Sequence, residues 1–231
     1  MHFKKLLLPL LILFGLSTSI SQEQIDLDPL GGWYTYNFDH TFGTSNWGLN
    51  GEVQYTGYEA TGDLNWFLVR TGLTYQLPES KVKFALGYGH ATFGVIGPEE
   101  SKVTEHRIYQ EMKMPSKILG LTLNHRFRYE QRFFNGFFRS RFRYGLFFNI
   151  PLNNKQLLAK TWYLALYDEL FINGERQLRN GGEVTFFDQN RIYGALGYAF
   201  TNNFKIQLGA MRLTRSTDDR MTLQASLHHK F

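Results

Sequence analysis

The sequence predicts an all-β fold, a single closed antiparallel transmembrane β-barrel of about twelve strands, with about ten as the alternative. Three observations predict this fold. Segments of about ten residues alternate apolar and polar side chains along most of the chain. The chain begins with a segment that has the features of an export leader, and it ends on an apolar phenylalanine, Phe231.

The N-terminal segment has the order of a secretory signal peptide. Lys4 and Lys5 precede an apolar run of 11 residues at positions 6–16, and a run of small residues follows at 17–21. The apolar run is too short for a membrane anchor helix, which needs about 20 residues. We therefore expect a signal peptide over residues 1–21 and a β-barrel over residues 22–231.

The last ten residues alternate strictly, with Leu223, Ala225 and Leu227 on the same face as Phe231. A terminal strand that stops on an apolar-face phenylalanine resembles the assembly signal of bacterial outer-membrane barrels, although His229 departs from the bulky apolar residue usual at its position. The resemblance implies localisation in the bacterial outer membrane. It also implies outer-membrane lipids, the barrel-assembly machinery and periplasmic chaperones as partners.

Composition excludes several other classes of protein. The formal net charge of +5 falls to about +3 without the leader, a mild excess rather than the concentrated patch of a nucleic-acid binder. The absence of cysteine excludes disulfides and a lipid-anchored N-terminus. Aromatic residues are abundant and spread over nearly every strand-like segment, as in the two aromatic girdles of a membrane barrel.

Eleven segments are strand candidates, at residues 33–42, 47–58, 64–75, 81–92, 105–114, 119–133, 137–150, 158–172, 186–200, 204–213 and 221–231. A closed antiparallel barrel with both termini on one side needs an even number, so we expect one strand missed or one falsely assigned near the N-terminus. Long connections at 94–102 and 173–184 should lie at the outer rim, and short turns at 115–116, 151–154 and 201–203 at the periplasmic rim.

The strongest alternation occurs in two segments joined by Asn135-Gly136, a strong hairpin signal. Arginines facing lipid would cost about 2–4 kcal/mol each at mid-bilayer, so in a membrane barrel this face must point inward. A soluble exported β-sandwich is the alternative fold, and it would expose the same face to water at no cost. We call the set the arginine face; it consists of Arg126, Arg128, Glu130, Arg132, Arg139, Arg141 and Arg143.

Two interpretations of the arginine face remain open. A cationic wall in a narrow lumen favours anions, so the face is a candidate path for anionic solutes. Alternatively, carboxylates from inward faces of other strands neutralise the arginines in a structural lattice. The candidate carboxylates are Glu52, Glu105, Glu111, Glu130 and Glu169.

Other candidate sites are weaker. Asp168, Glu169 and Arg191 form a predicted cluster near the outer rim, more typical of salt bridges that hold a loop than of a ligand site. Ser226 and His228 share a strand face, but that face points inward, away from lipid substrates, and the Gly-x-Ser-x-Gly motif is absent. The histidines show no metal-ligand spacing. We therefore predict no catalytic, cofactor-binding or metal-binding residues.

Several motifs together are similar to the exported domain-of-unknown-function 2490 family. They are residues 126–133 and 139–144 of the arginine face, Tyr-Asp-Glu-Leu-Phe at 167–171, Gln-Asn-Arg at 189–191, Gly-Tyr at 197–198, and the early segments 33–36 and 70–75. The resemblance covers essentially the whole chain after the leader. It implies an outer-membrane type of barrel and supplies no activity.

These observations predict a non-enzymatic outer-membrane barrel, a small porin-like channel or transport-related protein with a lumen that favours anionic solutes. The alternative is a closed, non-conducting barrel that serves as a structural or surface-binding protein through its outer loops. An outer-membrane lipid hydrolase is the third possibility.

Overall fold

The computed structural model describes residues 30–231 except 63, 95–101, 119–120 and 179–180, so the expected signal peptide lies outside the described residues. No helix long and apolar enough to cross a membrane occurs in this part of the chain. The described residues form eleven strands: β1 (Gly31–Thr41), β2 (Trp47–Gly57), β3 (Leu64–Gln76), β4 (Lys83–Phe93), β5 (Val103–Ile118), β6 (Leu121–Phe134), β7 (Phe137–Pro151), β8 (Thr161–Asn173), β9 (Phe187–Ala199), β10 (Phe204–Arg215) and β11 (Asp219–Lys230).

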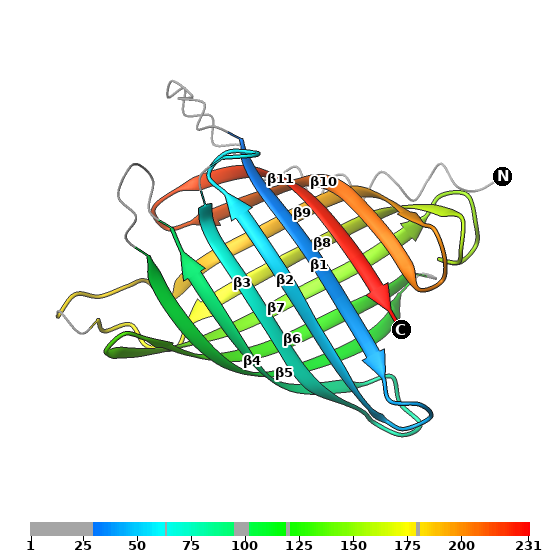
Figure 1. Cartoon of the computed structure of the whole chain (residues 1–231), viewed down its shortest axis with the longest axis horizontal. Coiled ribbons are helices and arrows are strands. Elements are labelled where there is room, and N and C mark those ends of the chain that lie inside the picture. The colour runs from blue at the N-terminus through cyan, green and yellow to red at the C-terminus, as the bar shows by residue number, and fades with distance from the viewer. Residues whose placement is uncertain (1–29, 63, 95–101, 119–120, 179–180) are drawn as a thin grey trace.

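The strands close into one barrel, which confirms the predicted all-β fold (Figure 1). Each strand is antiparallel to the next, but β1 pairs with β11 in parallel, so the closed sheet is mixed. The eleven strands correspond one to one with the eleven candidate segments. Eleven strands are close to the expected twelve, but the number is odd, so the expectation of an even number is wrong. A parallel closing pair allows an odd number, because the first and last strands then run in the same direction.

Strict alternation within each strand sorts the side chains into an inner and an outer face. In β3, Trp66, Leu68 and Arg70 are buried, while Phe67 and Val69 between them are exposed. The polar residues of β11 lie inside and its leucines outside, as the C-terminal pattern predicts. The outer wall is therefore largely apolar and the inner wall largely polar.

The connections divide between the two ends of the barrel. β4 and β8 end at the rim where β11 begins, so the strand ends that flank the two long connections lie opposite the C-terminal rim, as expected. Asn135-Gly136 forms the predicted two-residue hairpin, where Gly136 has a φ of 84°. The expected turn at 115–116 is wrong. β5 continues to Ile118, with Pro115 aligned with Asn124, since proline can occupy a strand where its nitrogen is not needed as a donor.

Glycines on the inner face make room for large lumen side chains. A Cβ on Gly87 would lie 2.2 Å from Cζ of Tyr109, the residue aligned with it on β5. The ring of Tyr109 is 2% exposed and lies under the guanidinium groups of Arg70 and Arg128, at 5.8 and 4.7 Å from its centroid. The glycine therefore allows an aromatic ring to lie flat on the wall, beneath two cations.

The parallel seam is testable by cross-linking, because the native chain has no cysteine. Tyr34 and Ala225 are directly aligned across it. Neighbouring strands lie about 4.8 Å apart, within the Cα separation that a disulfide bridges. The double variant Tyr34→Cys/Ala225→Cys should therefore form an intramolecular disulfide, detected by a mobility shift on non-reducing gels. Tyr34→Cys/Phe231→Cys is the matched control and should stay reduced; the opposite pattern contradicts the seam.

The close packing at Gly87 predicts a stability difference between two identical substitutions. Gly87→Ala should lower the free energy of unfolding by about 1–3 kcal/mol, because the added Cβ displaces Tyr109. Gly194→Ala is the control, since the nearest atom to its added Cβ lies at an ordinary 3.5 Å. Thermal unfolding of the barrel in detergent compares them. Equal stability of the two variants would contradict the proposed packing.

Candidate functional site

The arginine face lies inside the barrel on β6 and β7. The side chains of Arg128, Arg141 and Arg143 are 4–6% exposed. Arg126 and Arg132 are slightly more open, at 16% and 12%. Arg139 lies nearest the hairpin end of β7, where its Nη2 donates to Oδ1 of Asn173 at 2.9 Å. Burial of these groups requires compensation by carboxylates.

Glu130, on β6, is the carboxylate that contacts three of these six arginines. Its side chain is 1% exposed. Nη2 of Arg141 donates to one carboxylate oxygen at 2.7 Å, and Nη1 of Arg143 donates to the other at 2.6 Å. Arg128 and Arg70 lie at 3.7 and 3.9 Å from the carboxylate. One anion thus connects four guanidinium groups from three strands, β3, β6 and β7.

The other four predicted carboxylates also lie in the lumen and pair with arginines. The ion pairs are Glu52 with Arg70, Glu105 with Arg107 and Arg132, Glu111 with Arg128, and Glu169 with Arg126 and Arg143. Each pair joins side chains from the inner faces of one strand or of nearby strands. The geometry is that of the neutralising lattice, one of the two interpretations the sequence left open.

Arg191 bridges the lumen from wall to wall. Its guanidinium carbon lies 4.6 Å from the ring centroid of Phe171, 4.7 Å from that of Trp33 and 6.0 Å from that of Trp66. Arg191 is on β9 and Trp66 is on β3, five strands away in the barrel order and so on the opposite wall. Trp33 and Trp66 pack edge to face at 5.8 Å. These side chains meet inside the lumen and obstruct it at this level.

The predicted rim cluster does not form one site. Asp168 and Glu169 are consecutive in β8, so they point to opposite faces of the sheet. Asp168 is exposed on the outer wall, where its Oδ1 accepts from Nδ2 of Asn190 at 2.6 Å. Glu169 is aligned with Arg191 on β9, and both are buried within the lumen.

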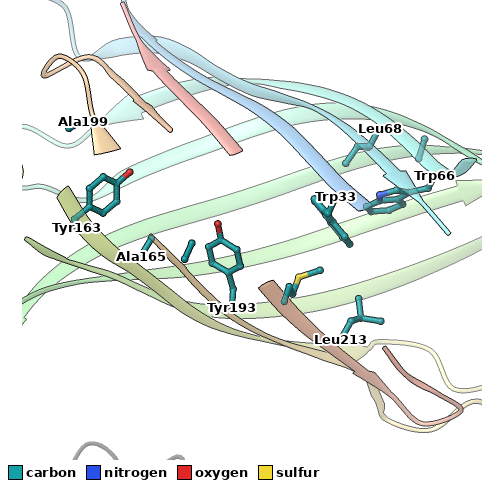
Figure 2. Packing of buried hydrophobic residues seen from close by; sticks show 11 residues of the cluster. Trp33, Trp66, Leu68, Tyr163, Ala165, Tyr193, Ala199 and Leu213 are labelled. Atoms are coloured by element: carbon teal, nitrogen blue, oxygen red, sulfur yellow. The ribbon is translucent and has the colours of Figure 1, made fainter. Parts of the chain in front are cut away.

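A cavity of about 450 Å³ occupies the half of the lumen toward the C-terminal rim. Trp33, Trp66 and Arg191 form its inner end, and the lining reaches the rim at Asn202 and Asn203, between β9 and β10. Tyr163 and Tyr193 point inward from the wall formed by β8 and β9 (Figure 2). The lumen therefore has a filled half and a hollow half, with Arg191 at the boundary.

The cavity lining is strongly cationic. It contains eight cationic side chains, Arg70, Lys113, Arg126, Arg128, Arg143, Arg191, Lys205 and Lys230, against three carboxylates, Asp39, Glu52 and Glu169. Within the described part of the chain, no carboxylate lies within 4.0 Å of the cationic groups of Arg191, Lys205 or Lys230. The cavity thus retains positive charge that the lattice does not neutralise.

Sequence reasoning missed Lys205 and Lys230, although a signal was present. Lys205 shares its strand face with Gln207, and Lys230 shares its face with Gln224, Ser226 and His228. If every second residue along the last two strands is assigned to the inward face, both lysines fall on that face. The inward positions of Trp33 and Trp66 were harder to find, since their neighbours of the same phase are mixed in character.

The remaining candidate residues lie as follows. Ser226 and His228 line the cavity, and Lys205 is aligned with His228 across the β10–β11 pair. Among the described residues, no group of three or more His, Cys, Asp or Glu could hold a metal ion. The backbone nitrogen of Phe231 donates to the carbonyl of Asp39 at 3.0 Å, and its ring stacks on Phe38. The last residue thus extends the parallel seam.

Removing the charge of Glu130 should destabilise the barrel strongly. In Glu130→Gln, Arg141 and Arg143 lose their shared anion while staying buried. Because Asp188 still pairs with Arg141 and Glu169 with Arg143, we expect the lower end of the usual cost of a broken buried pair, about 3 kcal/mol. The measurement is the midpoint temperature of thermal unfolding, followed by circular dichroism of the strands. Glu183→Gln is the control, because that glutamate pairs with Arg176 at the surface, where both side chains are about 60% exposed. Equal behaviour of the two variants would contradict the role of Glu130.

The chain was compared with known protein families, curated proteins and solved structures. No curated protein and no solved structure matches it. One family model matches residues 30–224, which is most of the chain and includes all of β1 to β10, with the complete arginine face. This chain therefore belongs to the family described as protein of unknown function (DUF2490), as the sequence motifs indicated.

Proposed function

We propose that this protein is a bacterial outer-membrane β-barrel that binds small anionic solutes in the cavity at its C-terminal rim and does not conduct them freely. The observation that carries the proposal is the cavity itself. Its lining is cationic, and the bridge of Arg191, Trp33 and Trp66 closes its inner end. A site with one open end and excess positive charge suits binding of anions better than their passage.

The outer wall supports a position in a membrane. Large apolar side chains are exposed on the outer face of every strand, among them Tyr34, Tyr55, Phe67, Leu86, Ile108, Phe127, Phe142, Leu164, Leu196, Leu208 and Leu223. A groove of about 760 Å³ on this wall is lined mainly by aromatic and aliphatic residues of β2 to β7. A water-soluble monomer rarely exposes apolar surface of this extent, whereas lipid tails would cover it at no cost.

The interior argues against a freely conducting pore. The filled half of the lumen contains residues from nearly every strand that are buried to a few per cent, including Glu105, Arg107, Phe171, Met211 and Leu213. Passage of a solute requires displacement of Arg191 from its aromatic neighbours and of several paired charges from each other. The excess of cationic side chains in the cavity still supports the preference for anions that the sequence predicts, in the form of anion binding rather than anion conduction.

We propose a non-enzymatic role without a cofactor. Ser226 and His228 face the lumen, so they are separated from lipid acyl chains by the barrel wall. The partners that follow from this proposal are outer-membrane lipids, the assembly machinery and periplasmic chaperones, which would recognise the terminal strand with Phe231. The small anionic solute would enter from the rim where that strand ends.

Planar bilayers test the closed lumen. The folded wild-type protein should give no steady conductance across a salt gradient, because the Arg191 bridge obstructs the lumen. The double variant Arg191→Ala/Trp66→Ala removes the bridge and leaves the paired charges, so it should give brief anion-selective openings where the wild type gives none. Trp162→Ala is the control, as this residue lies on the outer wall. Steady anion-selective steps from the wild type would overturn the closed barrel and favour a channel.

A further inference from the structure

The cavity has two kinds of surface that a simple anion site does not need. Nine amide side chains line it: Asn37, Asn50, Gln54, Asn124, Asn149, Asn202, Asn203, Gln207 and Gln224. Aromatic rings line it as well: Trp33, Phe38, Trp66, Tyr109, Phe147, Tyr163, Tyr167 and Tyr193. Cations alone would suffice for an inorganic anion. Amides and aromatics together suit a ligand with many hydroxyl groups and apolar ring faces.

The wall formed by β8 to β11 is organised as a polar network on aromatic rings. Tyr167 and Tyr193 stack at 4.7 Å between centroids. The hydroxyl of Tyr167 donates to Oε1 of Gln224 at 3.2 Å, and Nε2 of Gln224 donates to Ser226 at 2.9 Å. Nε2 of Gln207 donates to the hydroxyl of Tyr163 at 3.3 Å. Each amide and hydroxyl can donate and accept, which matches the hydroxyl groups of a sugar.

Several polar atoms at the cavity are buried and have no partner within the described part of the chain. They include Oγ1 of Thr35, Oδ1 of Asn50, Nε of Arg126 and Nε2 of His228. A buried polar atom without a hydrogen bond is unfavourable. These atoms expose almost no surface to the cavity, so small movements of their side chains would bring them to a ligand that supplies both donors and acceptors. A hydroxylated ligand supplies both, whereas an inorganic anion supplies only acceptors.

The cations mark where the charged group of such a ligand binds. Lys205 lines the cavity on β10, aligned with His228 on β11. Lys230, two residues further along β11, lines the same end of the cavity. Deeper in the lumen, Arg70, Arg126 and Arg143 are held by Glu52, Glu130 and Glu169, and Arg191 packs on aromatic rings. Lys205 and Lys230 have neither kind of partner among the described residues. They are free to bind the carboxylate of a ligand.

We propose that the cavity is a binding site for a sugar acid, a uronic acid of one or two rings, with its carboxylate at Lys205 and Lys230 and its ring against the tyrosines. This inference rests on the proposed function and specifies the ligand class of the same cavity. The volume of about 450 Å³ is in the range of small-ligand pockets. Fatty acids suit the site poorly, because amides and charges occupy most of the lining.

Tryptophan fluorescence of the full barrel in detergent reports binding directly. Trp33 and Trp66 form the inner end of the cavity, while Trp47 and Trp162 are exposed on the outer wall. In the background variant Trp47→Phe/Trp162→Phe, only the cavity tryptophans contribute. Titration with galacturonate should change this signal, with an affinity at least about tenfold higher than for acetate or for galactose, since each of these lacks one half of the interactions.

Two substitutions test the carboxylate-binding part and the sugar-ring-binding part of the site separately. Lys205→Gln should weaken galacturonate binding about tenfold or more and leave the weak galactose binding unchanged. Tyr193→Phe should weaken galacturonate binding and leave acetate unchanged, because only the sugar uses the hydroxyl. Lys155→Gln, in the exposed connection at the same rim, is the control for loss of one positive charge. Retention of the fast-migrating folded form on gels verifies folding of each variant.

The outcomes distinguish this inference from the proposed function. If acetate and galacturonate bind equally well, the cavity is an anion site without sugar recognition, and the inference fails while the proposed function stands. If galactose binds as well as galacturonate, the cationic anchor is wrong and both fail. If no anion binds and the wild type is silent in bilayers, both anion proposals fail and only the closed barrel remains.

Discussion

Compensation of buried charge inside the barrel is the constraint on which the rest of this structure depends. Closure of the sheet sends every second side chain into a narrow lumen, and β6 and β7 bring their arginines with them. Burial of so many guanidinium groups is tolerable only with carboxylates within hydrogen-bond distance. Glu130 and Glu105 supply them, and both are almost completely buried. The side chains that fill the interior are therefore the same ones that neutralise its charge.

The lattice also decides where empty space can remain. Paired charges and the aromatic side chains around Arg191 fill the lumen toward the long connections. Toward the C-terminal rim the inward residues are mainly amides, tyrosines and lysines, and Lys205 and Lys230 among them have no carboxylate partner within the described part of the chain. Those side chains leave a cavity of about 450 Å³ between them. The filled half thus gives the hollow half a rigid inner end.

Local sequence information predicted the faces and failed on the contacts between distant strands. A period of two is a property of each strand alone, so the inward direction of Arg128 or Glu169 followed from the sequence. The pairing of Arg191 with Trp33 and Trp66 depends on the curvature and register of the closed barrel, which no single segment encodes. The same limit explains the parity error. All eleven segments were recognisable from local alternation. The direction of the closing pair depends on how strands from the two ends of the chain meet, which local alternation does not encode.

The parallel seam has a consequence for how the barrel forms and opens. Its nine aligned pairs join residues about 190 positions apart in sequence, from Gly31 with Thr222 to Asp39 with Lys230. Contacts of such separation form late, since a long loop must close before they are gained. Parallel pairing is also slightly weaker per residue than antiparallel pairing. Closure at β1 and β11 is thus the last step of folding, and this seam is the place where the finished wall separates most easily.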